Sequence, residues 1–226
     1  MSWSVRAASA PFIWLEGEQP ARINVQTKSD GVGNPHFLSE SNWLKISIEA
    51  EKVEKDAPAE GVLVDYAFEA RSAGEHEIWA RLGYEAVRSE FEWRLDDGDW
   101  KRVSPEELTT DLMELSFWTE VAWLKLGNLP VSAGRRTLSF RLPNTKDAKG
   151  KPRRMLFALD CLCLSAGEFH PYSHFKPGED HQTGQDRAAA QHQFQMPEAK
   201  TNGARVSLKL AGPWEICRHD EQMPGE

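Results

Sequence analysis

Apolar residues recur at every second position along much of the chain between residues 12 and 165. The pattern is clearest in five segments, 62–69, 78–82, 91–95, 121–126 and 138–142. A period of two places apolar side chains on one face of a β-strand and leaves the other face for other contacts. Because turn residues such as Gly, Pro and Asp separate these short segments, the pattern predicts an all-β fold, a β-sandwich.

Two segments at the ends of this region carry the carboxylates of most interest. The last expected strand, 155–164, is apolar at nearly every position except Asp160, which is typical of a strand covered on both faces. Near the start, Glu16 and Glu18 are two residues apart and would share a face of a strand. If the first and last strands are neighbours, Asp160 joins them in a cage of carboxylate oxygens, which is suited to Ca²⁺.

Two other interpretations of Glu16 and Glu18 remain open. Charged residues are ordinary on the solvent face of an edge strand. Two carboxylates could also form the catalytic pair of a glycosidase, although nothing near them in the sequence indicates a cleft.

The connections between strands contain two recognisable local signals. The turn at residues 96–99 includes Asp97-Gly98, which supplies the positive φ of a tight hairpin turn. The segment Ser104-Pro105-Glu106-Glu107 is a capping box with proline at the first helical position, so we expect one short helix there.

The character of the chain changes after Ser165. Residues 167–205 are rich in Gln, His, Lys, Pro and Asp without sustained periodicity, and we expect a linker. Alternation returns from residue 206, so 206–226 is expected to hold the first strand or strands of a following, truncated β-domain. Residues 1–11 are expected to be an N-terminal tail. They lack the apolar stretch of a signal peptide, so either the protein is cytoplasmic or an export signal has been removed.

Composition excludes several classes of function. The formal net charge of −8 over 226 residues argues against a nucleic-acid partner. No apolar run approaches the ~18 residues that would span a membrane, and no nucleophile–base arrangement, phosphate loop or HExxH motif is present. We therefore expect that this chain itself is not an enzyme. Cys161 and Cys163 are expected to be small buried residues.

Six segments, in order, are similar to one family. They are Leu15-Glu16-Gly17-Glu18, then 61–68, 73–81, 118–122, 131–140 and Ala158-Leu159-Asp160-Cys161-Leu162-Cys163-Leu164. Together they resemble the β-jelly-roll carbohydrate-binding modules of families 6 and 35, which have the galactose-binding-like fold. The resemblance covers roughly residues 12–166, with a C-terminal extension beyond it.

The resemblance implies site residues. In the family, the opening glutamates and the closing aspartate hold a structural calcium, which assigns that role to Glu16, Glu18 and Asp160. Gly17 replaces the family's alanine, which we expect to be a mild departure. Family sugar sites lie in the loops at one end of the sandwich, and this position nominates Phe117, Trp118, Asn144, Tyr84, Arg88 and Lys146.

The resemblance also implies a function. We expect a non-catalytic carbohydrate-binding module of a multidomain glycoside hydrolase, with the catalytic domain of the same parent chain as its other partner. The loop 143–154 lacks the family's Gly-Trp-Asn arrangement and is strongly basic, so an anionic or a galactose-containing glycan is the expected ligand. The alternative is a structural module that packs domains together and has lost sugar binding.

A second, shorter resemblance lies near the end of the chain. Residues 208–216 resemble the opening strand of a family 2 glycoside hydrolase, which would make the parent protein such an enzyme. The family resemblance implies an extracellular or periplasmic location.

Overall fold

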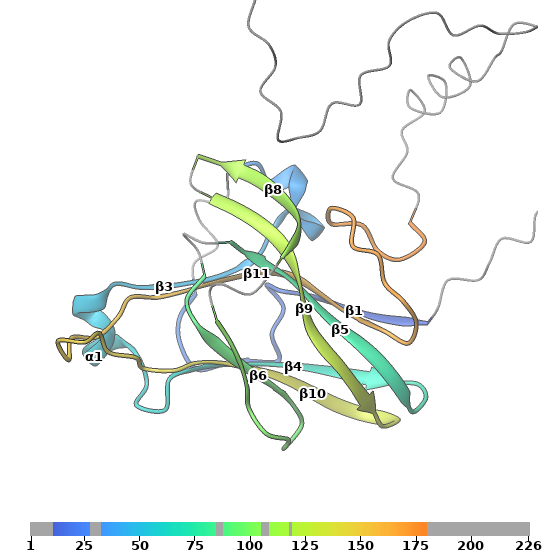
Figure 1. Cartoon of the computed structure of the whole chain (residues 1–226), viewed down its shortest axis with the longest axis horizontal. Helices are drawn as coiled ribbons and strands as arrows, with labels where there is room; N and C mark the ends of the chain where they lie inside the picture. Colours follow the sequence, from blue (N-terminus) through green and yellow to red (C-terminus); the bar gives the residue numbers. More distant parts are fainter. Residues whose placement is uncertain (1–10, 28–32, 85–87, 105–108, 118, 180–226) are drawn as a thin grey trace, which may run out of the picture. The chain divides into compact units, whose positions relative to one another are not determined.

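The computed structural model describes residues 11–27, 33–84, 88–104, 109–117 and 119–179. Its strands form two antiparallel sheets that face each other, with β1, β3 and β11 above β4 and β10 in Figure 1. Sheet A runs in the order β1-β11-β5-β9-β8, with β3 also paired to β11; its strands are Phe12–Glu16, Met155–Ser165, Gly74–Gly83, Thr119–Val131, Thr110–Ser116 and Leu44–Ile48. Sheet B runs in the order β2-β4-β10-β6-β7; its strands are Arg22–Ile23, Val62–Ala70, Gly134–Leu142, Phe91–Leu95 and Lys101–Val103.

The expected all-β sandwich is confirmed, and its first and last long strands are neighbours. β1 pairs antiparallel with β11, with Glu16 opposite Cys161. The connections β4–β5, β9–β10 and β10–β11 each cross from one sheet to the other, which is the connectivity of a jelly roll.

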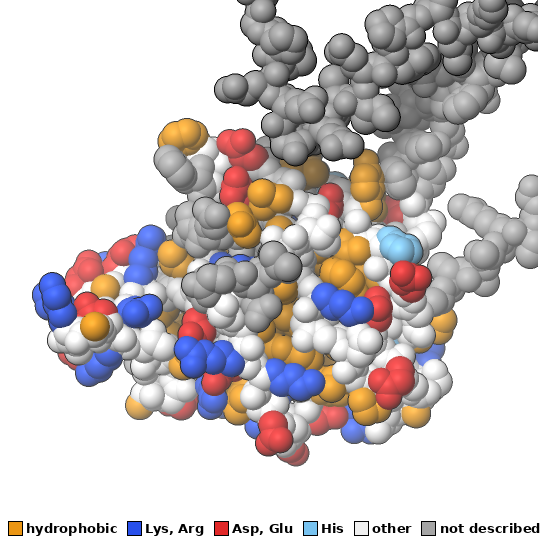
Figure 2. Space-filling model, in the orientation of Figure 1, with side chains coloured by type: hydrophobic (Ala, Val, Ile, Leu, Met, Phe, Trp, Pro, Cys, Tyr) orange, Lys and Arg blue, Asp and Glu red, His pale blue; other side chains and the backbone are white. Residues whose placement is uncertain are grey.

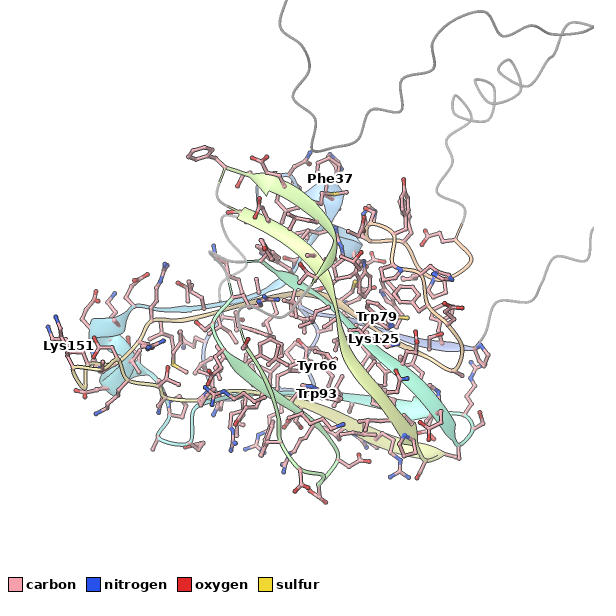
Figure 3. The ribbon with its side chains drawn as sticks, viewed as in Figure 1. Phe37, Tyr66, Trp79, Trp93, Lys125 and Lys151 are labelled. Atoms are coloured by element: carbon pink, nitrogen blue, oxygen red, sulfur yellow. The ribbon has the colours of Figure 1, made fainter. Side chains whose placement is uncertain are left out.

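The core explains why the alternating segments became strands. Val62, Val64, Tyr66 and Phe68 of β4 are buried against apolar residues of the facing sheet, whereas the residues between them point outward. Figure 3 shows Tyr66 and Trp93 in the interior of the sandwich. Burial of apolar surface, at roughly 25 cal/mol per Å², drives this packing and fixes the side of each strand that faces inward.

The helical elements differ in place from the sequence prediction. The α-helix of the described residues is α1, Val53–Asp56, and it follows the 3₁₀ turn η3, Ala50–Lys52. Two further 3₁₀ turns, η1 (Pro35–Phe37) and η2 (Ser39–Ser41), lie between β2 and β3. The helix expected at residues 104–107 falls mainly on residues outside the described ranges. No helix of the described ranges is long and apolar enough to cross a membrane.

The turn between β6 and β7 also differs from the prediction. The positive φ is at Asp96 (49°), whereas Gly98 is not among the glycines with positive φ. The Asp96 carboxylate accepts a hydrogen bond from the Thr137 backbone N–H at 2.9 Å. Asp96 tolerates this backbone conformation because a short polar side chain can bond locally in the left-handed region.

A β-bulge interrupts the pairing of β11 with β5 between Leu159 and Cys161. Leu159 and Leu162 both belong to the central core, whereas Cys161 packs in a separate cluster on the other side of sheet A. The extra residue in the bulge lets Asp160 and Cys161 both leave the core side. The bulge therefore determines which groups Asp160 meets.

Residues 166–179 lie on the outer face of sheet A. Phe169 is buried, with its ring centroid 5.8 Å from that of Trp79 and 5.1 Å from that of Trp123. The Trp123 indole N–H donates to the Ser173 carbonyl at 2.7 Å. This segment, which includes the first part of the expected linker, is folded against the sandwich; residues 180–226, with the expected following strand, lie outside the described ranges.

Candidate functional site

The residues nominated for sugar binding lie at one end of the sandwich. β5 and β10 end here, and β9 and β11 begin here, because these strands pair antiparallel with their neighbours. The connections that carry Tyr84, Arg88, Phe117 and the loop 143–154 therefore share this end. Within it, the structure separates the β8–β9 tip from the region around α1 (Figure 1).

A cavity of about 400 Å³ lies between α1 and the loop 143–154. It brings together two of the nominated residues, Asn144 and Lys146. The other residues that line it are Val53, Glu54, Ala57, Ala59, Thr145 and Pro152. The lining combines apolar surface with an amide, a hydroxyl and charged groups, a mixture that small-ligand sites commonly have.

Hydrogen bonds hold Asn144 in this cavity. Its amide nitrogen donates to the carbonyl oxygens of Pro58 at 2.8 Å and Ala59 at 3.2 Å. Both amide protons are thus directed to the chain's own backbone, and the amide oxygen is the group that can accept a bond from a ligand hydroxyl. The Lys146 ammonium lies 3.9 Å from the exposed Glu54 carboxylate.

The basic loop is ordered by its own aspartate. The Asp147 carboxylate accepts hydrogen bonds from the backbone N–H groups of Lys149 at 2.8 Å and Lys151 at 2.9 Å. Gly150 adopts a φ of 75°, which this tight turn requires. As a result Lys149 and Lys151 are exposed on the outside of the loop, and Figure 3 shows Lys151 at the α1 end of the molecule.

The other nominated residues are distributed around this end of the sandwich. Phe117, at the β8–β9 tip, is 78% exposed. Arg88 is buried, and its backbone forms an isolated β-bridge with Phe157 of β11. Its guanidinium carbon lies 5.7 Å from the Tyr84 ring centroid. The structure therefore separates these residues from the α1 cavity, and Trp118 lies outside the described ranges.

Asp160 is bound to Arg81 rather than gathered with the glutamates. The Arg81 Nη1 atom lies 2.6 Å from Asp160 Oδ2, and neither side chain is exposed. The other carboxylate oxygen accepts the Ser39 backbone N–H at 2.9 Å. Burial raises the pKa of Asp160 to about 6, and the Arg81 charge opposes that rise, so this carboxylate is ionised at neutral pH.

The expected three-carboxylate cage is thus not assembled. Within the described ranges, no group of three or more His, Cys, Asp or Glu side chains is placed to hold one metal ion. Asp160 shares the outer face of sheet A with Glu16, but on that face its oxygens accept hydrogen bonds from Arg81 and from the Ser39 N–H. Arg81 was missed in the sequence, although a charged residue in an otherwise apolar strand, the same signal that singled out Asp160, marks it.

Glu16 and Glu18 lie in a different electrostatic setting. One oxygen of each carboxylate, Oε2, is buried without a hydrogen-bond partner. Burial raises the pKa of Glu18, and the nearby charges of Glu16 and Glu40 add to the effect. The Lys176 ammonium lies 3.4 Å from Glu16 Oε1 and 3.8 Å from Glu40 Oε1. Sequence reasoning missed Lys176 because it lies 160 residues from Glu16 in a segment without periodicity.

Gly17 lies between these glutamates and is more constrained than the sequence indicated. A Cβ atom at this position would lie 2.0 Å from the Leu159 carbonyl oxygen. The Gly17 N–H donates to the Asp160 carbonyl at 2.7 Å, and its own carbonyl accepts from the Tyr66 hydroxyl at 2.6 Å. The departure from the family's alanine is therefore structurally important.

Comparisons with known proteins return solved structures that contain family 35 carbohydrate-binding modules. No protein-family model matches the sequence, and curated proteins give no match. A family 35 carbohydrate-binding module from an environmental isolate matches with a TM-score of 0.45 and 13% identity, over 71% of this chain and 98% of that one. The family 35 module of Cellvibrio japonicus Abf62 matches with a TM-score of 0.43 and 16% identity, over 70% of this chain and 95% of that one.

A third match is to a larger enzyme. A β-(1,4)-mannanase of Podospora anserina that carries a family 35 module matches with a TM-score of 0.43 and 10% identity, over 73% of this chain. The present chain spans only 29% of that protein's length.

Proposed function

We propose that this chain is a non-catalytic carbohydrate-binding module and that its sugar site is the cavity between α1 and the loop 143–154. The observation that supports the proposal most directly is the cavity lining. Val53, Ala57 and Pro152 provide apolar surface, and Asn144 and Lys146 provide polar groups beside it. A sugar requires both, because its C–H face is apolar and its hydroxyls need directional partners.

The charge around the cavity favours an anionic glycan. Lys146 lines the cavity, and Lys149, Lys151 and Arg153 are exposed on the same loop. Uronic-acid polysaccharides are therefore the first ligands to test, followed by galactose-containing ones. The module would serve a glycoside hydrolase in the same parent chain, by keeping the enzyme close to its substrate, in an extracellular or periplasmic setting.

Calcium remains a proposal for Glu16 and Glu18. Their unpartnered, buried Oε2 atoms fit a cation, whereas Asp160 does not fit because both of its oxygens already accept hydrogen bonds. A bound calcium would neutralise the two glutamates at the end of β1. Lys176, which lies beside Glu16, provides a positive charge of the chain's own at the same place.

A glycan-array screen of the full chain in calcium tests the function. For a glycan that binds, calorimetry should show weaker binding by Asn144→Ala and Lys146→Ala. Arg135→Ala is the matched control, because Arg135 is an exposed cation near the start of β10, at the opposite end of that strand from the loop 143–154. If Asn144→Ala and Lys146→Ala bind like the wild type, the cavity is not the sugar site.

The second candidate is a structural module without sugar binding. Two residues that were predicted to bind sugar favour this alternative, because they contact the protein itself. Both Asn144 amide protons bind backbone carbonyls, and Arg88 is buried. A folded chain that binds nothing on a broad array would support this alternative.

A further inference from the structure

The outer face of sheet B carries a group of charged residues on β6 and β10. Alternation directs Trp93 and Phe140 into the core, which leaves their neighbours on β6 and β10 outside. Across these strands Arg94 is opposite Ser139, and Arg141 is opposite Glu92. Figure 2 shows Lys and Arg side chains near the position of β6 in Figure 1, with Asp and Glu side chains among them.

One indole ring contacts two of these arginines. Trp100, just before β7, is half-buried, and the guanidinium carbons of Arg94 and Arg141 each lie 4.4 Å from its ring centroid. A guanidinium that lies against an aromatic ring keeps its N–H donors directed outward in its own plane. Trp100 therefore contacts two planar donor groups that come from neighbouring strands.

Only one of the two guanidiniums has a carboxylate partner among the described residues. Arg141 Nε donates to Glu92 Oε2 at 2.6 Å. Arg94 has no ion pair within those ranges, and its Nε atom is buried without a hydrogen-bond partner. The nearest acid in the same row of the sheet, Asp65, accepts the hydroxyl of Ser139.

This imbalance distinguishes Arg94 from the other arginines on sheet B. Arg102 pairs with Glu90, and Arg136 lies 3.3 Å from Asp96. Arg22 and Arg135 lack an ion pair within the described ranges but are exposed to water, where an unpaired charge costs little. The two guanidiniums at Trp100 share one carboxylate and so leave a net positive charge on a half-buried, preorganised surface.

We propose that Arg94, Arg141 and Trp100 form a second binding site, on the outer face of sheet B, for the carboxylate of a uronic-acid residue in an acidic polysaccharide. The Arg94 guanidinium would donate two parallel hydrogen bonds to that carboxylate, the geometry for which arginine is suited. The choice of a sugar carboxylate rests on the proposed function; the anion site itself rests on the guanidinium geometry.

The first test observes the site directly. The indole N–H resonance of Trp100 in the full chain is assigned by its absence in Trp100→Phe and is then followed during titration with sodium glucuronate or glucose. We expect a shift with glucuronate but not with glucose, and loss of the shift in Arg94→Gln. The matched control is Arg135→Gln, which removes the same charge from the same face, roughly 20 Å along β10 from Arg141.

The result separates this proposal from the sugar site at α1. No shift with glucuronate, or an equal shift in Arg94→Gln and the wild type, would overturn the anion site whether or not any glycan binds the chain. If polygalacturonate binds, we expect Arg94→Gln to weaken it about tenfold, the loss of one charge-assisted pair, while Arg135→Gln changes it little. Glycan binding that depends on Asn144 but not on Arg94 would support the α1 site and overturn the second site at Arg94.

Discussion

The buried pair of Arg81 and Asp160 should be the most sensitive point of the fold to single substitutions. Arg81 Nη1 lies 2.6 Å from Asp160 Oδ2, both side chains are completely buried, and Arg81 also donates to the Phe37 carbonyl at 2.7 Å. Phe37 belongs to the η1 turn and lies beside β8 in Figure 3. The pair therefore connects the η1 turn to the centre of sheet A. The perturbations are Asp160→Asn, Arg81→Met, and the double variant Arg81→Met with Asp160→Leu.

The magnitude follows from burial. Removing one partner leaves an uncompensated buried charge, which costs about 3–5 kcal/mol of the free energy of unfolding. For a domain of this size 1 kcal/mol corresponds to about 2–4 °C, so each single variant should lower the melting temperature by roughly 6–20 °C. The double variant leaves no charge unpaired and should lose less than the sum of the two single losses.

Urea unfolding followed by tryptophan fluorescence gives the free energies. Arg102→Met is the control, because Arg102 pairs with Glu90 on the surface and is 68% exposed; its unfolding midpoint should stay close to that of the wild type. Single variants that lose less than about 1 kcal/mol, or losses that simply add in the double variant, would refute the reasoning.

Three other predictions concern β1 and its surroundings. If calcium binds Glu16 and Glu18, chelator should lower the melting temperature of the wild type, and Glu18→Gln should remove this effect. Equal melting curves with and without chelator would indicate that Lys176 is the sole counter-ion of these glutamates. Gly17→Ala should destabilise the fold by roughly 1–3 kcal/mol or more in urea, because its Cβ would lie 2.0 Å from a carbonyl oxygen; an unchanged midpoint would contradict that clash. Because burial raises the pKa of Glu18 above its ordinary 4.5, the folded state without calcium binds a proton there more readily than the unfolded state, so this carboxyl's contribution to stability is present below pH 4.5 and should be lost as pH rises through the raised pKa. Urea unfolding of wild type and Glu18→Gln in chelator at pH 4, 5, 6 and 7 measures this contribution, and a difference that does not vary with pH would contradict it.

Local patterns were sufficient for the strands that alternate. Residues 62–69, 91–95 and 138–142 were predicted as strands, and β4, β6 and β10 occupy those positions. Here one face meets the core and the other meets water, so local sequence and final environment agree. β2, β3 and β8 were missed: β2 is only two residues long, and β8 follows a segment in which a helix was expected. β3 does alternate apolar and polar residues, so its signal was present in the sequence but is short.

The candidate sites depended on information that a local pattern does not contain. Asn144 and Lys146 were nominated by the position of their loop, and they do line one cavity, but its other wall is α1, which no strong capping signal announces. Lys176 reaches Glu16 from a segment that was expected to be a linker. Contacts of this kind are fixed by tertiary packing after the strands have formed.

Asp160 shows how an unpredicted partner changes a chemical interpretation. The sequence correctly indicated that a carboxylate stands out in an apolar strand, and β1 and β11 are neighbours, as the calcium hypothesis requires. A bulge that regular alternation does not predict lies between Leu159 and Cys161, and it leaves Asp160 and Cys161 both on the outer face of sheet A. A buried carboxylate requires a counter-charge, and on that face Arg81 from β5 provides it at 2.6 Å. The same residue that suggested a metal ligand is therefore satisfied by the protein, and any cation at β1 has to be held without it.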